Sequence, residues 1–276
     1  MPFSKAQLDQ YENDGYVSPI DVLKPAEIAA CRASLEAIEA QNGGQLLPAQ
    51  RPKSHLLFKW LDDLIRDPRV LDPIEELIGP NILCWNTIFW IKDAHSETFV
   101  SWHQDNTYWG LSSDKVLTAW LALSPARVEN GCMRVMPGTH KGNTLHHEDR
   151  FHDDNMLTRG QEITAGVDDS RAAYMPLEPG QMSIHNYRTA HASGPNLGSD
   201  RRIGVSMHFM PADTQQVVGD WDSAALVRGV DPNRSFEHTP RVSCDLDPAV
   251  LEFQAKAAQA INAIVYSGAA VNTAKL

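Results

Sequence analysis

Residues 101–110 read Ser-Trp-His-Gln-Asp-Asn-Thr-Tyr-Trp-Gly and lie between two stretches rich in strand-forming residues, 81–92 and 115–122. His103 and Asp105 are two positions apart, so on an extended chain their side chains leave the same face. A neutral imidazole beside a carboxylate supplies two of the three ligands of a facial triad, which holds Fe(II) and leaves positions open. The stretch therefore predicts a metal centre whose third ligand is a histidine further along the chain.

The composition is typical of a soluble globular protein and is compatible with a neutral or cationic small substrate. The chain has 276 residues, of which 42% are hydrophobic and 21% charged. Its net charge of −11 argues against nucleic acid and anionic membranes as partners. No apolar run reaches the roughly 18 residues of a membrane span, and the first residues lack a secretory signal. The four cysteines follow no metal-binding spacing, so we expect a reduced, cytoplasmic protein.

Helix signals come first in the chain, and strand signals follow. We expect helices that run from Ser4 to about Asn13, from Pro25 to Gly43, and from Asp67-Pro68 or Asp72-Pro73 to Gly79. Strand-like runs occupy 82–91, 116–123, 132–136, 181–187 and 203–210. A last helix has Asp247 as its expected N-cap and Pro248 in its first turn.

This order predicts a mainly β sandwich or barrel with flanking helices. No linker or internal repeat divides the chain, so we expect one domain over 1–276. It comprises a helical flank to about residue 80, a β core over about 81–212 and a C-terminal helix over about 247–266.

The candidate third ligand is His191, which follows a strand-like run and precedes a Ser-Gly-Pro-Asn turn. Eleven residues later, Arg202 opens a strand on which alternate residues, Arg202, Gly204, Ser206 and His208, share one face. An arginine inside a β core needs an anion, and its planar guanidinium suits a carboxylate. His185 would lie on the same face as His191 in an unbroken strand and is the rival third ligand.

Three motifs in this order resemble the phytanoyl-CoA dioxygenase family: His-Gln-Asp at 103–105, Pro-Gly-Thr-His-Lys-Gly at 137–142, and His-Ala-Ser-Gly-Pro-Asn at 191–196 with Arg202 beyond it. Members are Fe(II)- and 2-oxoglutarate-dependent oxygenases with a double-stranded β-helix (jelly-roll, cupin-like) fold. The resemblance covers most of the chain and implies that His103, Asp105 and His191 ligate iron. It further implies that Arg202 and Ser193 hold the distal carboxylate of 2-oxoglutarate, with Gln104, Trp120 and Asn86 close to that cosubstrate.

The resemblance also implies the reaction. We expect hydroxylation of an unactivated C–H bond of a small-molecule metabolite, with O2 as oxidant and with release of succinate and CO2. Related halogenases have a small residue in place of the aspartate, so Asp105 favours hydroxylation over chlorination. Desaturation and ring formation stay open. Two other hypotheses also stay open: a cupin-like metal enzyme that does not use 2-oxoglutarate, and a jelly-roll binding protein with a vestigial metal site.

Residues near the predicted ligands are candidate substrate contacts: Asn106, Tyr108, Trp109, Tyr187 and Arg188. The aromatic ones could instead be core, or could pack an apolar or cationic substrate, and Arg188 could be an exposed loop residue. A patch rich in His and Asp over 146–154 could be mistaken for a second metal site. We expect it to be a mobile loop that covers the active site.

Overall fold

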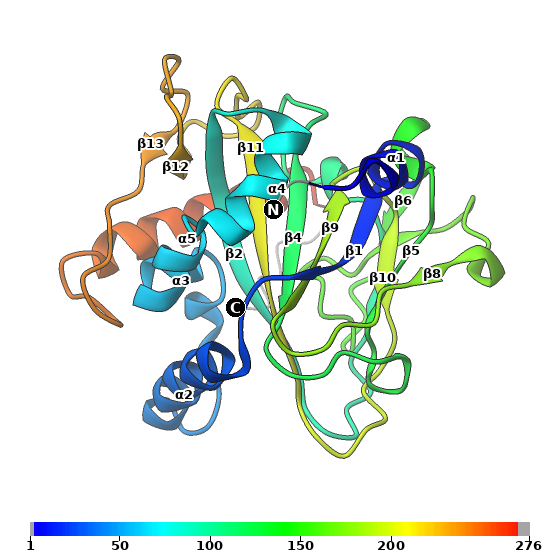
Figure 1. Ribbon diagram of the computed structural model, residues 1–276, viewed down its shortest axis with the longest axis horizontal. Coiled ribbons are helices and arrows are strands. Elements are labelled where there is room, and N and C mark those ends of the chain that lie inside the picture. Colours follow the sequence, from blue (N-terminus) through cyan, green and yellow to red (C-terminus); the bar gives the residue numbers. More distant parts are fainter. Residues whose placement is uncertain (1–2, 270–276) are drawn as a thin grey trace.

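Two β-sheets face each other, and helices cover the outer side of the larger one (Figure 1). The computed structural model describes residues 3–269. The larger sheet has the order β1-β9-β4-β11-β2-β12-β13, the smaller one has the order β3-β10-β5-β8, and β6 pairs with β7. This arrangement confirms the predicted jelly-roll core with flanking helices.

The strands of the larger sheet are β1 (Tyr16–Asp21), β2 (Ile82–Lys92), β4 (Leu117–Ala122), β9 (Gln181–Asn186), β11 (Arg202–Pro211), β12 (Ser223–Arg228) and β13 (Glu237–His238). Those of the smaller sheet are β3 (Val100–His103), β5 (Met133–Val135), β8 (Ala173–Tyr174) and β10 (His191–Ser193). The separate hairpin consists of β6 (His147–Asp149) and β7 (Gln161–Ile163). The helices are α1 (Lys5–Asp14), α2 (Pro25–Gln41), α3 (Lys59–Leu64), α4 (Pro68–Ile78) and α5 (Leu251–Val265).

The predicted helix starts are confirmed with one correction. Ser4 forms both bonds of a capping box, and Asp67 rather than Asp72 caps α4 by accepting from the backbone N–H of Arg69. The last helix begins at Leu251 and not at Pro248. The reason is that the Asp247 carboxylate accepts from the N–H groups of Ser243 and Ala249, which forms a turn ahead of the helix.

Strand β11 separates the hydrophobic core from the space between the sheets. Ile203, Val205, Met207 and Phe209 are fully buried in the core that includes residues of α2, α3 and α4. The alternate residues, which begin with Arg202, point to the other face, as the pattern predicted. The polar side chains of β11 therefore face the smaller sheet.

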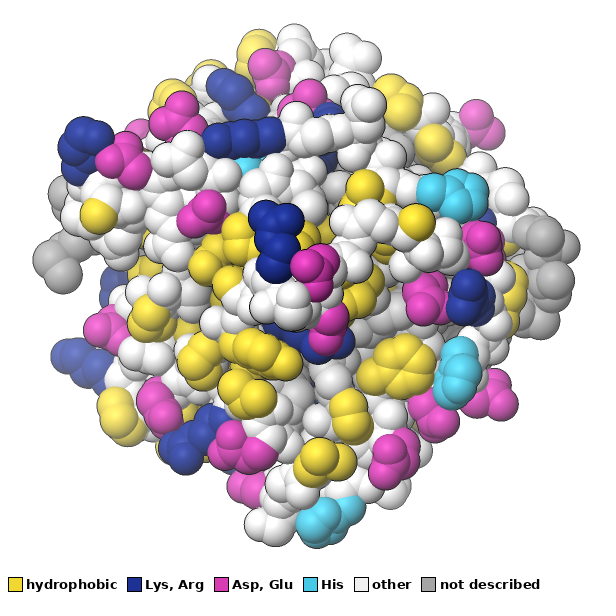
Figure 2. All heavy atoms as spheres, turned by 90° about the vertical axis from the view of Figure 1, so that its right-hand side faces the viewer, with side chains coloured by type: hydrophobic (Ala, Val, Ile, Leu, Met, Phe, Trp, Pro, Cys, Tyr) yellow, Lys and Arg dark blue, Asp and Glu magenta, His cyan; other side chains and the backbone are white. Residues whose placement is uncertain are grey.

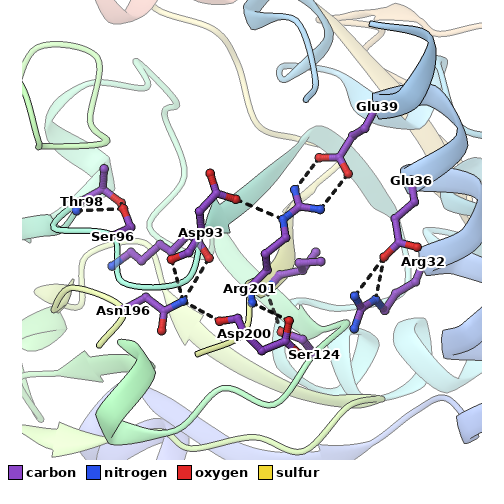
Figure 3. A network of polar contacts seen from close by, with 12 residues as sticks. Arg32, Glu36, Glu39, Asp93, Ser96, Thr98, Ser124, Asn196, Asp200 and Arg201 are labelled. Carbon is purple, nitrogen blue, oxygen red and sulfur yellow. Dashed lines mark hydrogen bonds and ion pairs between the residues drawn. The ribbon is translucent and has the colours of Figure 1, made fainter. Parts of the chain in front are cut away.

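A polar network fixes the turn that leads into β11 (Figure 3). The Arg201 guanidinium donates to both carboxylate oxygens of the buried Glu39 on α2, at 3.0 and 2.6 Å, and to Asp93 at 3.2 Å. The two N–H groups of the buried Asn196 amide are shared among three backbone carbonyls at the end of β2 and in this turn, at 2.8–3.2 Å from Nδ2. These contacts hold the start of β11, and hence Arg202, against the end of β2.

The surface over the smaller sheet carries both signs of charge. Figure 2 shows acidic and basic side chains interspersed over this face, with hydrophobic side chains between them near its centre. Among residues 3–269, no helix combines the length and the apolar character needed to cross a membrane. The single-domain organisation stays a prediction, and residues 1–2 and 270–276 of that range lie outside the described residues.

Candidate active site

His103, Asp105 and His191 meet at the facing side of the smaller sheet. His103 and His191 are paired directly across strands β3 and β10, and Asp105 begins the turn after β3. Nε2 of His103 lies 3.5 Å from Oδ1 of Asp105, and Nε2 of His191 lies 4.0 Å from Oδ2. One donor atom from each residue lies within 4.8 Å of the others, and all three residues are buried. In the part of the chain that the structure describes, this is the one such cluster.

Both imidazoles keep Nε2 available for a metal. Nδ1 of His103 lies 2.9 Å from the carbonyl of Ser101, and Nδ1 of His191 lies 3.0 Å from that of Thr189. A carbonyl only accepts, so each Nδ1 carries the proton and each Nε2 is free to bind a metal. Burial, followed by the nearby His103, lowers the pKa of His191 well below its usual value, which keeps the ring neutral.

The carboxylate completes the donor set. Burial by itself would raise the pKa of Asp105, but the His191 and His103 imidazoles lower it below its usual value. The cluster thus offers two neutral nitrogens and one anionic oxygen, which is the donor set of a facial triad for Fe(II). The chemistry of the side chains fits this metal.

His185, the rival ligand, lies beside the cluster but outside it. His185 lies on strand β9, which pairs with β4, and its ring centroid is 4.4 Å from that of His191. Neither ring nitrogen has a hydrogen-bond partner within the described residues, and burial lowers its pKa to about 3. The fold therefore brings His191, and not His185, into the three-residue group.

A cavity of about 450 Å³ extends from the triad between the two sheets. Arg202 and Ser193 also line it, and the Arg202 guanidinium lies 5.4 Å from the centre of the Trp120 ring. Among residues 3–269, no carboxylate pairs with Arg202, and its Nε has no partner. Burial lowers the pKa of Arg202 to about 10, so it is still charged at neutral pH. A buried charge without a counter-ion is costly, which makes this end of the cavity a site for an anion.

The close approach of Trp120 to β11 depends on a glycine. A Cβ atom at Gly204 would lie 1.9 Å from Cζ2 of Trp120, so the indole occupies the space that any other side chain would fill. The alternation in the sequence places Gly204 on the same face as Arg202. The role of Gly204 in making room for Trp120 was not predicted.

A row of polar residues crosses the larger sheet near the triad: Asn86, His208, Thr118 and His185 are neighbours on β2, β11, β4 and β9. All four line the cavity. Thr118 donates to Asp105 at 3.5 Å, and His208 stacks on Trp109 with 4.3 Å between ring centres. Sequence reasoning missed Thr118 and His208 as cavity residues, although the alternation after Arg202 was a signal for His208.

The other predicted contacts divide into two groups. Asn86, Trp120, Tyr108 and Trp109 line the cavity. The remaining four residues, Gln104, Asn106, Tyr187 and Arg188, do not line it.

Gln104, Asn106 and Arg188 bind partners outside the cavity, whereas Tyr187 lies next to Trp109, which itself lines the cavity. Gln104 binds the backbone of Arg188 and Leu145. Asn106 binds Thr144, Tyr187 packs near Trp109, and Arg188 pairs with Asp114. The proposed ligand contacts therefore do not include them.

The patch over 146–154 is not the loose loop that we expected. Its residues 147–149 form β6, which pairs with β7, because the backbone finds hydrogen-bond partners there. Nε2 of His147 accepts from the backbone N–H of Gln104 at 2.9 Å, and its Nδ1 lies 2.8 Å from the carbonyl of Leu145. His147 thus holds the backbone of the metal motif. Residues 153–158 do line the cavity, beside Ile261, Asn262 and Val265 of the last helix.

Comparison with known proteins agrees with this geometry. The family model described as Phytanoyl-CoA dioxygenase (PhyH) matches residues 11–204, which is more than half of the chain. The probable alpha-ketoglutarate-dependent hypophosphite dioxygenase of Stutzerimonas stutzeri is 28% identical over 184 residues. That alignment covers 66% of this chain and 64% of the relative, so the chain spans less than two thirds of the relative's length.

Solved structures share the whole architecture. The non-heme monooxygenase ThoJ, in its apo form, is 32% identical with a TM-score of 0.82, over 94% of this chain and 97% of that chain. CytC3, solved with Fe(II) and alpha-ketoglutarate, is 24% identical with a TM-score of 0.62, over 86% and 93% of the two chains. At that identity, the second likeness concerns the fold alone.

Proposed function

This chain belongs to the phytanoyl-CoA dioxygenase family, and from that premise we propose that it is an Fe(II)- and 2-oxoglutarate-dependent oxygenase that hydroxylates an unactivated C–H bond of a small-molecule metabolite. One observation carries the proposal: a single cavity is lined by the His103–Asp105–His191 cluster and by a buried arginine with which no carboxylate of residues 3–269 pairs. A ligand with a metal-binding 2-oxo acid group and a second carboxylate matches both features.

In this proposal, His103, Asp105 and His191 hold the iron, and Arg202 with Ser193 binds the distal carboxylate of 2-oxoglutarate. Bound iron and 2-oxoglutarate supply the activation of O2, with release of succinate and CO2. Trp120 and Asn86 form walls of the cavity near the cosubstrate. Arg202 is itself buried, which strengthens its charge interaction with a ligand.

Asp105 favours hydroxylation over halogenation, because its carboxylate takes the ligand place that a halide would need. Desaturation and ring formation use the same metal centre, so analysis of the product decides among them. A cavity of about 450 Å³ suits a small molecule, and Trp85, Trp109 and His208 give it an aromatic wall. The free state of all four cysteines supports a reduced compartment, and we propose the cytoplasm.

The first test is an anaerobic titration of metal-free protein with Fe(II) and 2-oxoglutarate, followed by the weak visible charge-transfer band of their complex. We expect the band only when both are present, and no band in His191→Ala. The matched control is His185→Ala, which removes a neighbouring buried imidazole and should keep the band. A band that survives in His191→Ala and disappears in His185→Ala would refute the ligand assignment.

Succinate release then separates the remaining alternatives. Arg202→Ala should raise the 2-oxoglutarate concentration needed for turnover by at least about tenfold. Tight iron binding without any effect of 2-oxoglutarate would instead indicate a cupin-like enzyme that does not use it. Absence of iron binding would indicate a vestigial site.

A further inference from the structure

Lys92, at the end of β2, is a fully buried lysine next to the anion end of the cavity. It pairs directly with Arg202 across strands β2 and β11. Its Nζ lies 2.8 Å from the Ser193 hydroxyl, contacts the carbonyl of Gly194 and is 3.4 Å from the carbonyl of Ser193. Lys92 does not itself line the cavity. Any influence that it has on a ligand therefore passes through Ser193 or through its charge.

No carboxylate of residues 3–269 acts on the Lys92 amine. Of these residues, Arg202 on β11 and the Cys132 thiol are the ionisable groups that act on it. Burial first, and Arg202 second, lower the pKa of Lys92 to about 6. Without a ligand, the amine is therefore mostly neutral at pH 7.5, whereas an anion at Arg202 would favour its charged form.

We propose that Lys92 is a positioning residue for the cosubstrate: it takes up a proton from solvent when the dicarboxylate binds and thereby turns the Ser193 hydroxyl towards the distal carboxylate. A neutral amine has a lone pair that can accept the Ser193 O–H. A charged ammonium has only donors, so the hydroxyl must accept from Lys92 and its proton is released for the ligand. This inference rests on the proposed binding of 2-oxoglutarate at Arg202 and Ser193.

The test is calorimetry of 2-oxoglutarate binding to the anaerobic Fe(II)-loaded protein in two buffers of different ionisation enthalpy. At pH 7.5 the wild type should take up close to one proton per ligand, and at pH 5 close to none. Lys92→Met should take up none at either pH and should bind 2-oxoglutarate at least about tenfold more weakly at pH 6. The ligand 2-oxobutanoate lacks the distal carboxylate and should bind both proteins equally.

Two outcomes would overturn the inference. One is equal proton uptake by the wild type and Lys92→Met, and the other is an equal loss of affinity for both 2-oxo acids, which would indicate a merely structural role. The wild type gives a check that needs no variant: log Kd for 2-oxoglutarate should rise by up to one per pH unit above about pH 6. If the wild type binds no 2-oxoglutarate, the proposed function fails; if it binds without this pH dependence, only the role of Lys92 fails.

Discussion

Replacement of Gly204 by alanine should damage the cosubstrate end of the cavity. The new methyl group would lie 1.9 Å from Cζ2, 2.4 Å from Cη2 and 2.5 Å from Cε2 of Trp120, where ordinary contacts are 3.4–4 Å. Either the indole or strand β11 must therefore move by about 1.5 Å. The indole cannot move freely, because Trp120 is 3% exposed and packs in a cluster with Ala122, Ala126, Cys132 and Leu177.

The size of the effect follows from this enclosure. Overpacking of a filled core costs about 1–3 kcal/mol, and we expect about 2 kcal/mol here because some adjustment of Trp120 is open on the cavity side. For a chain of this length, that corresponds to a fall in Tm of about 4 °C. The displaced ring also disturbs the Arg202 guanidinium that lies over it, so 2-oxoglutarate should bind about tenfold more weakly.

The assay is differential scanning calorimetry together with the anaerobic 2-oxoglutarate titration. The matched control is Gly142→Ala, whose added methyl group would meet only the carbonyl of Thr139, at 3.7 Å. This control should keep the wild-type Tm to within about 1 °C. The reasoning is refuted if Gly204→Ala and Gly142→Ala have the same Tm and the same 2-oxoglutarate affinity.

Three further predictions concern the fold and the metal. Arg201→Ala leaves the buried Glu39 carboxylate without its partner and should lower the free energy of unfolding by about 2 kcal/mol in urea titrations. The control is Arg127→Ala, at an exposed ion pair, which should change the free energy of unfolding by less than about 1 kcal/mol. Equal losses in the two variants would contradict the prediction for Arg201. Fe(II) at about 100 times its Kd should raise the free energy of unfolding by about 2.7 kcal/mol in the wild type but not in His103→Ala, and a chelator should reverse the gain. Asn196→Ala leaves three backbone carbonyls without the Asn196 amide and should lower the free energy of unfolding by about 3 kcal/mol or more. A free energy of unfolding close to that of the wild type in urea would refute the role of Asn196 in holding the turn before β11.

Much of the site could be predicted from the sequence because the patterns that indicate it lie within short segments. His103 and Asp105 are two apart on a strand and its following turn, and the alternation after Arg202 separates the core face from the cavity face. The helix starts at Ser4 and Asp67 follow from capping chemistry within a few residues. The mainly β class and the His103–Asp105 pair were therefore predictable from residue types and spacing, whereas the jelly-roll class and the choice of His191 over His185 rested on the family resemblance.

Where the arrangement differs from what local spacing suggested, the deciding contacts join residues that are far apart in sequence. Gln104 and Arg188 lie close to predicted ligands in sequence, yet the Gln104 side chain binds the backbone of Arg188 and Leu145, and the Arg188 guanidinium pairs with Asp114. His147 lies in a polar stretch that resembles a loop, yet its ring accepts from the backbone of the metal motif. Spacing along one segment contains no information about such partners.

What the sequence by itself determined is the chemistry of the donors: two imidazoles, a carboxylate and an arginine on a strand face. The tertiary structure decided which of them meet, and it did so through strand register. The pairing of β3 with β10 sets His103 opposite His191, and the pairing of β2 with β11 sets Lys92 opposite Arg202. A shift of one residue in either pairing would turn those side chains to the other face of the sheet, so long-range hydrogen bonding between strands, and not local pattern, assembles the site.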